Sequence, residues 1–373
     1  MSRFNCALVL FLPLLVGAPS GCRDGTSPSG SGAPTVVWRT TLAVDPQQIW
    51  LGRPAADPIR TIVEAGNQLF ALNSATGAIL WQRKIRISAD PPTTFPLIDA
   101  GRVYLAEVDS TYALDGATGA TVWTFHADSA GVVEPAIDAT TIYIGQRGIP
   151  TVYALNKTTG ALRWRTNLAV GSSFAAVVRG FAVRGDTVYA TVLREKSANG
   201  FLSSGVLVAL AAKDGHELWR YETPGDHGSF ITAPLLLPDV VVINDFAGDA
   251  VLAIDPRTQN VRWRQAVANA YLVYGNGALY GAGADGHVYA LNPMTGTVQW
   301  STALPSSAGG LALCGNSVWE NSGNLHRVDA ATGAERGGLS ASGLGTFASD
   351  VGTSGQRVFI AGGNLVTAVA CDQ

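Results

Sequence analysis

Residues 152–164 read VYALNKTTGALRW, and this frame of residues returns along most of the chain. It recurs at 111–123 (TYALDGATGATVW) and at 288–300 (VYALNPMTGTVQW). The spacing of about forty residues is typical of propeller blades and other repeat architectures. The repeats therefore predict one repeat body, although the length of 373 residues alone would suggest two or three domains. Further copies lie at 69–81, 207–219 and 251–263, with a weaker copy at 325–337.

Each copy of the frame has the pattern of two strands joined by a tight turn. In the first copy, Phe70 and Leu72 alternate with residues of the opposite face, as in a strand. Asn73 can start the turn through its side chain, and Gly77 can take the positive φ that closes a short hairpin. Two further strand-like runs precede the frame, as at 96–99 and 103–105 before the second copy. Four strands in each unit predict β-propeller blades.

The two ends of the chain complete each other. Runs near 345–350, 357–361 and 365–369 resemble three strands of a blade that lacks its fourth strand. Residues 36–38 (VVW) resemble an outer strand that lacks its blade. Joining them gives an all-β, eight-bladed β-propeller of four-stranded antiparallel blades, closed by the N-terminal outer strand in the C-terminal blade. Closure is favourable because a ring leaves no blade face exposed.

The N-terminus has the pattern of an export signal. Residues 7–18 (ALVLFLPLLVGA) form an apolar core that is too short to span a bilayer. We expect residues 1–22 to be a signal peptide, residues 23–33 to be a flexible Gly/Ser/Pro tether, and residues 34–373 to be the propeller. Cleavage after Ala18 is the alternative, and it would release a secreted protein.

Residues 19–22 (PSGC) resemble the lipobox of bacterial lipoproteins, in which the cysteine becomes the lipidated first residue. Ser20 and Gly21 fit this motif, whereas Pro19 replaces the usual aliphatic residue. The resemblance implies lipidation at Cys22, and by analogy with enterobacterial sorting it implies the periplasmic face of the outer membrane. The membrane would be contacted only through this anchor.

Cys314 and Cys371 remain as an even pair in an oxidising compartment. Each is expected at a turn on the same end of the ring, in blades seven and eight, so a disulfide between them is possible. The spacing of the cysteines does not match a zinc site. The formal net charge of −3 gives no basic surface for nucleic acid, so we exclude that class of partner.

The frame A-L-(N/D)-x-x-T-G-x-x-x-W resembles the PQQ-like repeat of quinoprotein dehydrogenases and of BamB-type outer-membrane assembly lipoproteins. The resemblance covers nearly all of residues 34–373. It implies that each tryptophan packs between neighbouring blades against a glycine-containing turn. Gly337 replaces the tryptophan of the seventh copy, and Gln259 replaces the turn glycine of the fifth. The tryptophans given this structural role are Trp38, Trp81, Trp123, Trp164, Trp219, Trp263 and Trp300.

A PQQ-dependent enzyme is the first alternative to weigh. The resemblance implies that many such enzymes carry adjacent cysteines over the cofactor, and this chain has no Cys-Cys pair. Calcium needs several converging oxygen ligands, and the best local candidates are Asn244-Asp245 and Asp226-His227. The histidines are scattered without metal-ligand spacing. We therefore predict no catalytic residue, cofactor or metal site, with PQQ and Ca²⁺ required only under this alternative.

A binding role is the remaining hypothesis. The fourth unit is about a dozen residues longer than its neighbours, and the excess lies at 193–204 (LREKSANGFLSS). We expect either a partner contact or a tolerated insertion there. The expected function is a non-catalytic, monomeric scaffold that binds envelope proteins, and the resemblance implies a BamB-like role in outer-membrane protein assembly. A channel-site enzyme and a secreted ligand-binding or sensor propeller are the alternatives. The candidate partner residues are Arg194, Glu195, Lys196, Phe201 and Leu202.

Overall fold

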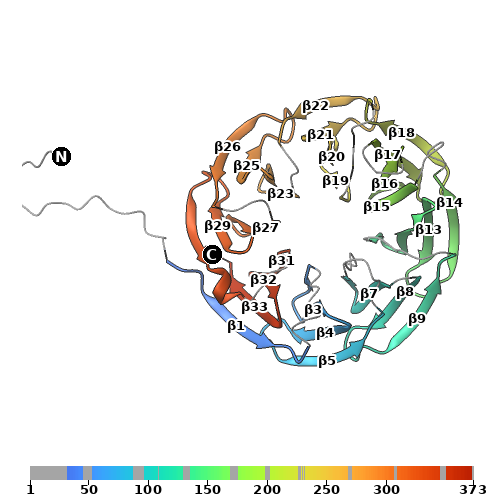
Figure 1. Ribbon diagram of the computed structural model, residues 1–373. Helices are drawn as coiled ribbons and strands as arrows, with labels where there is room; N and C mark the ends of the chain where they lie inside the picture. Colours follow the sequence, from blue (N-terminus) through green and yellow to red (C-terminus); the bar gives the residue numbers. More distant parts are fainter. Residues whose placement is uncertain are drawn as a thin grey trace, which may run out of the picture. The chain divides into compact units, whose positions relative to one another are not determined.

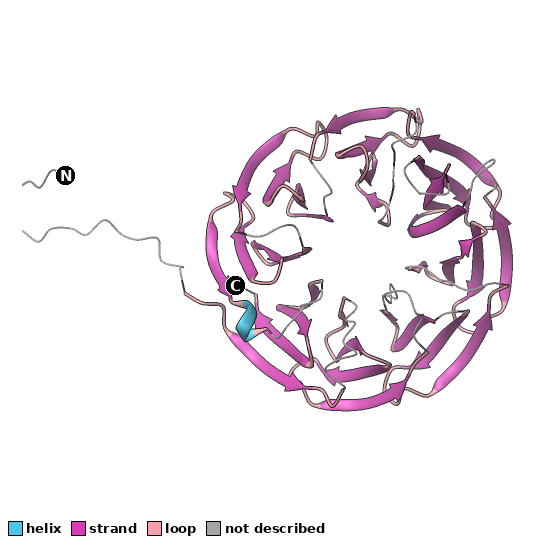
Figure 2. Cartoon of the chain, in the orientation of Figure 1, coloured by secondary structure: helices cyan, strands magenta, loops and turns pink. Residues whose placement is uncertain are grey.

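The structure is a computed structural model. It shows eight antiparallel sheets arranged as blades around a central channel, which confirms the all-β, eight-bladed fold (Figure 1). One short 3-10 helix, η1 (Ala341–Gly343), accompanies the strands (Figure 2). No helix among the described residues has the length and apolar character to cross a membrane. The described residues are 32–44, 53–86, 96–107, 109–128, 135–168, 175–197, 202–225, 228, 230, 232–267, 271–305, 309–344 and 350–371.

The expected signal peptide, most of the tether and Cys22 lie outside the described residues, as do Phe201, Asp226 and His227.

Each blade has four strands, ordered from the channel outward. Blade one contains β2 (Ala55–Ala56), β3 (Arg60–Ala65), β4 (Gln68–Asn73) and β5 (Ile79–Lys84), and blade two contains β6 (Leu97–Asp99), β7 (Arg102–Glu107), β8 (Ser110–Asp115) and β9 (Thr121–His126). Blade three contains β10 (Ala136–Ile137), β11 (Thr141–Gly145), β13 (Thr151–Asn156) and β14 (Leu162–Asn167). Blade four contains β15 (Ala175–Arg184), β16 (Thr187–Glu195), β17 (Ser203–Ala211) and β18 (Glu217–Glu222). Blade five contains β19 (Leu235–Leu236), β20 (Val241–Asp245), β21 (Ala250–Ile254) and β22 (Val261–Gln265), and blade six contains β23 (Tyr271–Gly275), β24 (Ala278–Ala282), β25 (His287–Leu291) and β26 (Val298–Ala303). Blade seven contains β27 (Gly310–Cys314), β28 (Ser317–Asn321), β29 (Leu325–Asp329) and β30 (Glu335–Leu339). Blade eight contains β31 (Gly352–Ser354), β32 (Arg357–Gly362), β33 (Leu365–Ala370) and β1 (Val36–Thr41).

The N-terminal strand closes the ring. β1 pairs antiparallel with β33, and Trp38 lies opposite Ala368. The innermost strand of this blade differs from the expectation, because β31 begins at Gly352, after the run at 345–350 that the sequence suggested. Residues 345–349 lie outside the described residues. The ring is therefore closed by backbone hydrogen bonds between the two ends of the chain.

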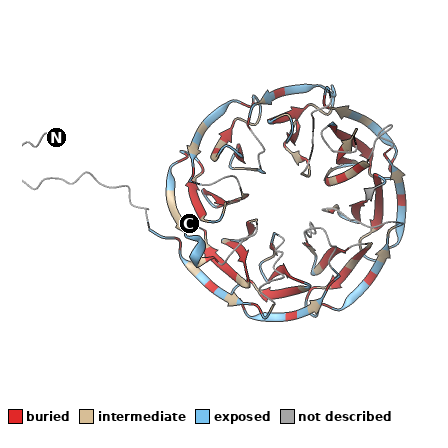
Figure 3. Cartoon of the chain, viewed as in Figure 1, coloured by how far each residue is buried: buried red, intermediate tan, exposed pale blue. Residues whose placement is uncertain are grey.

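The outer strands show why the blades do not pair edge to edge with other molecules. β5 alternates exposed and partly exposed residues around the buried Trp81, and β9 and β14 have the same pattern (Figure 3). The register shifts just before Trp81, which is a β-bulge, and the same shift occurs in the other hairpins of the frame. Bulges and charged residues on an outer strand disfavour pairing with another chain.

The apolar core lies between neighbouring blades. One cluster contains Ile62, Leu69 and Trp81 from blade one together with Val103 and Leu105 from blade two, and the side chains of these residues are almost wholly buried. Similar clusters fill the other junctions. The flat faces of the blades thus supply the hydrophobic burial that stabilises the ring.

The insertion in the fourth unit lengthens the blade and is only partly a loop. β16 continues to Glu195 and β17 starts at Ser203, so residues 193–195 and 203–204 of the expected loop belong to strands. β12 (Arg147–Gly148), from the preceding blade, pairs with β15 as a fifth strand. Blade four is therefore the widest sheet among the described residues.

The antiparallel order of the strands gives the ring two distinct ends. The tryptophan end carries the turns between first and second strands and the turns between third and fourth strands. The linker end carries the turns between second and third strands and the connections from one blade to the next. These two names are used below.

Candidate functional site

The tryptophans of the frame join neighbouring blades at the tryptophan end. Trp81 Nε1 donates a hydrogen bond to the carbonyl oxygen of Gly116 in the next blade at 2.9 Å. A Cβ on Gly119 in the same turn would lie 2.7 Å from Trp81 Cε3, so only glycine allows this close approach. Equivalent Nε1 hydrogen bonds to turn carbonyls are made by Trp38, Trp123, Trp164, Trp263 and Trp300.

The fifth unit uses a different residue in this turn. Gln259 replaces the turn glycine and still adopts a positive φ of 61°. Trp219, from the preceding blade, packs edge-on against Tyr189, with ring centroids 5.9 Å apart. The turn geometry is thus retained at a position where a residue with a Cβ is strained.

Side chains also tie the first-to-second turns of successive blades together. Arg60 donates to the carbonyl of Gly101 at 3.3 Å, and Asn276 donates to the carbonyl of Gly315 at 2.9 Å. A disulfide joins Cys314 of blade seven to Cys371 of blade eight, with the Cα atoms 5.7 Å apart. The tryptophan end is therefore fastened by contacts within the ring.

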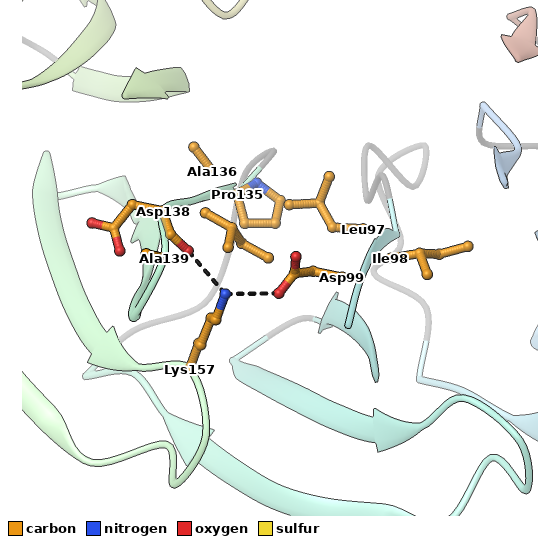
Figure 4. A pocket seen from close by; sticks show the side chains of 9 residues that line it. Leu97, Ile98, Asp99, Pro135, Ala136, Asp138, Ala139 and Lys157 are labelled. Atoms are coloured by element: carbon orange, nitrogen blue, oxygen red, sulfur yellow. Dashed lines mark hydrogen bonds and ion pairs between the residues drawn. The ribbon is translucent and has the colours of Figure 1, made fainter. Parts of the chain in front are cut away.

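A pocket of about 640 Å³ opens at the tryptophan end, between the inner strands of blades two and three (Figure 4). Lys157 extends from the third-to-fourth turn of blade three and places its ammonium group in the pocket. Lys157 Nζ lies 2.8 Å from Asp99 Oδ2 and donates to the carbonyl oxygen of Asp138 at 3.0 Å. Its side chain is 16% exposed and that of Asp99 is 36% exposed. The apolar lining residues are Leu97, Ile98, Pro135, Ala136, Ile137 and Ala139.

The two aspartates of the pocket have different roles. Asp138 Oδ1 accepts the backbone N–H groups of Thr140 and Thr141, and Asp138 Oδ2 accepts the Tyr143 hydroxyl at 2.6 Å. Burial opposes ionisation of Asp138, but these hydrogen bonds outweigh burial, so the pKa of Asp138 lies below its usual value. The carboxylate of Asp138 points away from Lys157 (Figure 4).

Asp99 is available to Lys157 because its own turn is built differently. Ala100 and Gly101 both have positive φ, 45° and 79°, and Asp99 pairs with Arg102 across this two-residue turn. Such a turn is closed by the backbone, so no aspartate side chain is needed to cap it. A non-glycine residue at positive φ is strained, and such strain is found mainly at sites where another part of the structure requires it.

Inner strands of five blades line a second cavity of about 370 Å³ in the central channel. Its walls include Pro54, Leu97, Val273 and Val351, and its charged lining residue is Arg53. Asp350 lies close by, and burial raises its pKa although Arg53 opposes this. Most of the residues that line this cavity have aliphatic side chains.

None of the described residues form a group of three or more His, Cys, Asp and Glu side chains that could hold a metal ion. Asn244 and Asp245 are buried at the end of β20, and Asp245 Oδ1 accepts the backbone N–H of Gly248 at 3.2 Å. Asp245 therefore has a role in its own turn.

Two buried glutamates bind the connections between blades. Glu107 accepts the backbone N–H of Arg86 at 3.1 Å, and Glu320 accepts the backbone N–H of Gly309 at 2.9 Å. Burial raises the pKa of both carboxyl groups. Sequence analysis did not single out these residues, although both lie at or near the end of a second strand.

The charged residues of the predicted partner loop are held against the blade. Arg194 pairs with Glu222 of the outer strand at 2.6 Å, and Lys196 lies 3.7 Å from the same carboxylate. Lys196 also donates to the carbonyl of Gly225 at 3.0 Å. Glu195 ends β16 and is partly exposed. Among the members of this set that the structure describes, Leu202 offers an exposed apolar side chain.

Exposed apolar side chains occur at the linker end on three successive blades. Ile149, Leu202 and Phe246 are 54%, 40% and 43% exposed. Each lies in the turn between the second and third strands of its blade, in blades three, four and five respectively. Large exposed apolar groups that lie near one another often mark a protein contact. Sequence analysis found Leu202 but missed the other two, which stand in turns of ordinary length.

A family model described as "Outer membrane protein assembly factor BamB" matches residues 31–149 and 110–336 of the chain. Tetrathionate hydrolase of Acidithiobacillus ferrooxidans is 23% identical over 255 residues, which cover 62% of this chain and 48% of the hydrolase. The chain thus spans about half the length of this curated relative.

Several solved structures share the fold. BamB from Moraxella catarrhalis has a TM-score of 0.68 and 17% identity, over 91% of this chain and 100% of that one. Quinohemoprotein alcohol dehydrogenase ADHIIG from Pseudomonas putida HK5 has a TM-score of 0.69 and 15% identity, over 91% and 76% of the chains. Sqt1 from Saccharomyces cerevisiae has a TM-score of 0.69 and 11% identity, over 92% and 100% of the chains. At these identities the likeness concerns the fold alone, and proteins of quite different function share it.

Proposed function

The chain belongs to the family of the outer membrane protein assembly factor BamB, and on this premise we propose that it is a non-catalytic scaffold that binds a protein partner in the cell envelope. The proposal assigns binding to the linker end of blades three to five. The observation that carries it is the set of exposed apolar side chains Ile149, Leu202 and Phe246.

These three side chains have the properties of contact residues. They stand at turns on neighbouring blades, where a partner could cover all of them at once. Burial of large apolar side chains at the centre of a contact supplies much of the affinity in protein complexes. Polar groups nearby, such as the Arg194–Glu222 pair, would form a rim that remains in contact with water.

The opposite end of the ring is less suited to this role. Its turn carbonyls accept hydrogen bonds from the tryptophans, and its inner turns are tied by Arg60, Asn276 and the disulfide. These groups are already satisfied within the ring. A partner there would gain little from pairing with them.

Attachment to the outer membrane through a lipid on Cys22 is part of the same proposal. It is supported by the lipobox-like residues 19–22 and by the family to which the chain belongs. Growth with a labelled fatty acid would place label on the wild-type chain and none on Cys22→Ser. Label on the variant, or none on either protein, would contradict lipidation at this residue.

The partner surface is tested by charge substitution. The full chain with Ile149→Asp, Leu202→Asp and Phe246→Asp is expressed in its native host, and partners are captured by chemical cross-linking in intact envelopes. We expect the yield of cross-linked partner to fall at least about tenfold, because each carboxylate would have to be desolvated in the contact.

The control places two such charges on exposed apolar residues of the tryptophan end, as Ile59→Asp and Met294→Asp, and it is compared with the two-charge variant Ile149→Asp, Phe246→Asp as well as with the triple variant. The control should cross-link like the wild-type chain. Equal cross-linking by the two charged variants, with both folded, would overturn the assignment of the linker end.

An enzyme with a site in the channel is the second candidate. The observation that favours it is the partial likeness to a tetrathionate hydrolase, together with the fold shared with a quinohemoprotein dehydrogenase. The channel test is titration of the purified chain with PQQ and Ca²⁺ during thermal melting. A ligand that binds only the native state stabilises the folded chain by about 2.7 kcal/mol when its concentration is a hundred times its Kd. We expect no shift, and a saturable shift or turnover of tetrathionate would favour the enzyme.

A further inference from the structure

We propose that the pocket between blades two and three binds the amide group of an extended aliphatic peptide segment, through Lys157 and Asp99. The pocket lies at the tryptophan end, whereas the proposed partner surface lies at the linker end. Each assignment can therefore fail while the other holds.

Lys157 and Asp99 offer an unused donor beside an unused acceptor. The ammonium group has three N–H donors, and two acceptors for it are present, Asp99 Oδ2 and the carbonyl of Asp138. Asp99 binds Lys157 through Oδ2, which leaves Oδ1 without a hydrogen bond from the described residues. A ligand that accepts from Nζ and donates to Oδ1 would satisfy both groups.

The charges of the pair determine which ligand fits. An ammonium and a carboxylate 2.8 Å apart cancel each other, so the pocket has little preference for a free anion or a free cation. A neutral group with a carbonyl oxygen and an N–H side by side matches the pair. The peptide or carboxamide group has this arrangement.

The pocket walls indicate what is attached to the amide. Leu97, Pro135 and Ile137 form aliphatic walls without an aromatic ring. The inner strands β6 and β10 each pair with one strand of their own blade, so their other edges face the channel. An extended peptide can add backbone hydrogen bonds at such an edge while aliphatic side chains pack on the walls.

The position of Lys157 in the repeat supports a special role. The corresponding residue in the other copies is small or proline: Ser74, Gly116, Ala212, Pro256, Pro293 and Ala330. The hydrogen bond from the preceding tryptophan uses only the backbone carbonyl at this position, as Trp123 shows with Lys157 at 3.0 Å. The structural role of this position therefore does not require a lysine side chain.

The test compares three small probes on the intact chain by calorimetry and ligand-observed NMR. N-acetyl-leucinamide carries the amide, isovalerate carries an anion on a similar aliphatic group, and isoamylamine carries a cation. We expect the amide probe to bind best. Lys157→Met should weaken it about tenfold, the loss expected for one charge-assisted hydrogen bond. Lys213→Met, which removes an exposed lysine from the corresponding turn of blade four, should have no effect.

Asp99→Asn gives a readout that a purely structural role would not change. It keeps the size of the side chain but leaves the charge of Lys157 uncompensated. In this variant isovalerate should bind more tightly than N-acetyl-leucinamide, which reverses the wild-type order. The proposal is overturned if no probe binds the wild-type chain, if folded Lys157→Met binds the amide unchanged, or if isovalerate is already the tightest ligand of the wild-type chain.

Discussion

Gly337 lies beside Gly32, and a Cβ on Gly337 would be 3.6 Å from the carbonyl oxygen of Gly32. The seventh copy of the frame lacks its tryptophan at a junction where a tryptophan would have no turn to pack on. Elsewhere the tryptophan packs on the turn between the third and fourth strands of the next blade. Blade eight has no such turn, because its fourth strand comes from the N-terminus. The N-terminal segment occupies the space instead.

Gly337→Trp should therefore destabilise the ring even though it restores the repeat. A tryptophan here would extend from a Cβ already in van der Waals contact with Gly32, and φ at this position is +94°. We expect a loss of about 1–3 kcal/mol in denaturant unfolding. Trp81→Gly makes the opposite exchange in an intact junction and should cost about 3–5 kcal/mol. A stabilised Gly337→Trp variant would show that this explanation is wrong.

Gln259→Gly should stabilise the fifth unit. Gln259 has a φ of 61°, a conformation that costs a residue with a Cβ about 1–2 kcal/mol. Glycine loses more chain entropy on folding, so the net gain should be roughly 0.5–1 kcal/mol. The matched control is Gly296→Ala, whose Cβ would lie 2.5 Å from Trp263 Cε3 and should destabilise. Calorimetric melting of both variants shows whether each substitution raises or lowers the stability, and a lower melting temperature for Gln259→Gly would contradict the prediction.

Loss of the Cys314–Cys371 disulfide should loosen the closure of the ring. The bond joins residues 57 positions apart in the sequence, and removal of a crosslink of this span costs about 4 kcal/mol in the chain-entropy model. The double variant Cys314→Ala, Cys371→Ala should melt at a lower temperature than the oxidised wild-type chain. Its melting temperature should equal that of the wild-type chain whose disulfide has been reduced by a thiol reductant. If the reductant leaves wild-type melting unchanged while the free thiols are titrated, the bond does not stabilise the closure.

The effect of Glu320→Gln on the stability of the folded chain should become more favourable as the pH rises. Burial raises the pKa of Glu320 in the folded chain above its value in the unfolded chain. The stabilising effect of its protonated form is complete below the unfolded pKa and is lost as the pH rises through the folded pKa. Glutamine keeps the acceptor for Gly309 without the buried charge, so the variant should gain stability relative to wild type between about pH 4 and pH 7. Melting curves across this range provide the measurement.

The control for Glu320→Gln is Asp186→Asn, which makes the same chemical change on an exposed residue. Its melting curves over the same pH range give the baseline against which the Glu320→Gln difference is compared. A flat difference for Glu320→Gln would mean that its carboxyl group is ionised as easily in the ring as in water.

The blade number and the closure could be predicted because one frame of residues is repeated at each outer hairpin. The position of Trp38 alone was enough to show that the N-terminus supplies an outer strand. The innermost strands are short and lack such a frame, which is why β31 was expected several residues too early. The insertion was located correctly, but its alternating residues also continue β16 and β17.

The pocket could not be predicted because it depends on two blades. Lys157 and Asp99 are 58 positions apart, and they meet only because the turn at Ala100 and Gly101 leaves the Asp99 side chain unused. One signal was present in the sequence: Lys157 breaks a run of small residues and prolines at its place in the frame. Departures from a repeat are therefore as informative about function as the repeat is about fold.

The pairing of β1 with β33 also determines how the ring responds to mechanical force. Trp38 and Thr40 bind the turn of blade one, while the disulfide holds the C-terminal strands to blade seven. A pull along β1 from the N-terminal side would load the hydrogen bonds of the β1–β33 ladder in shear, together and not one after another. A membrane anchor on this segment would therefore transmit its tension through the strand that closes the ring.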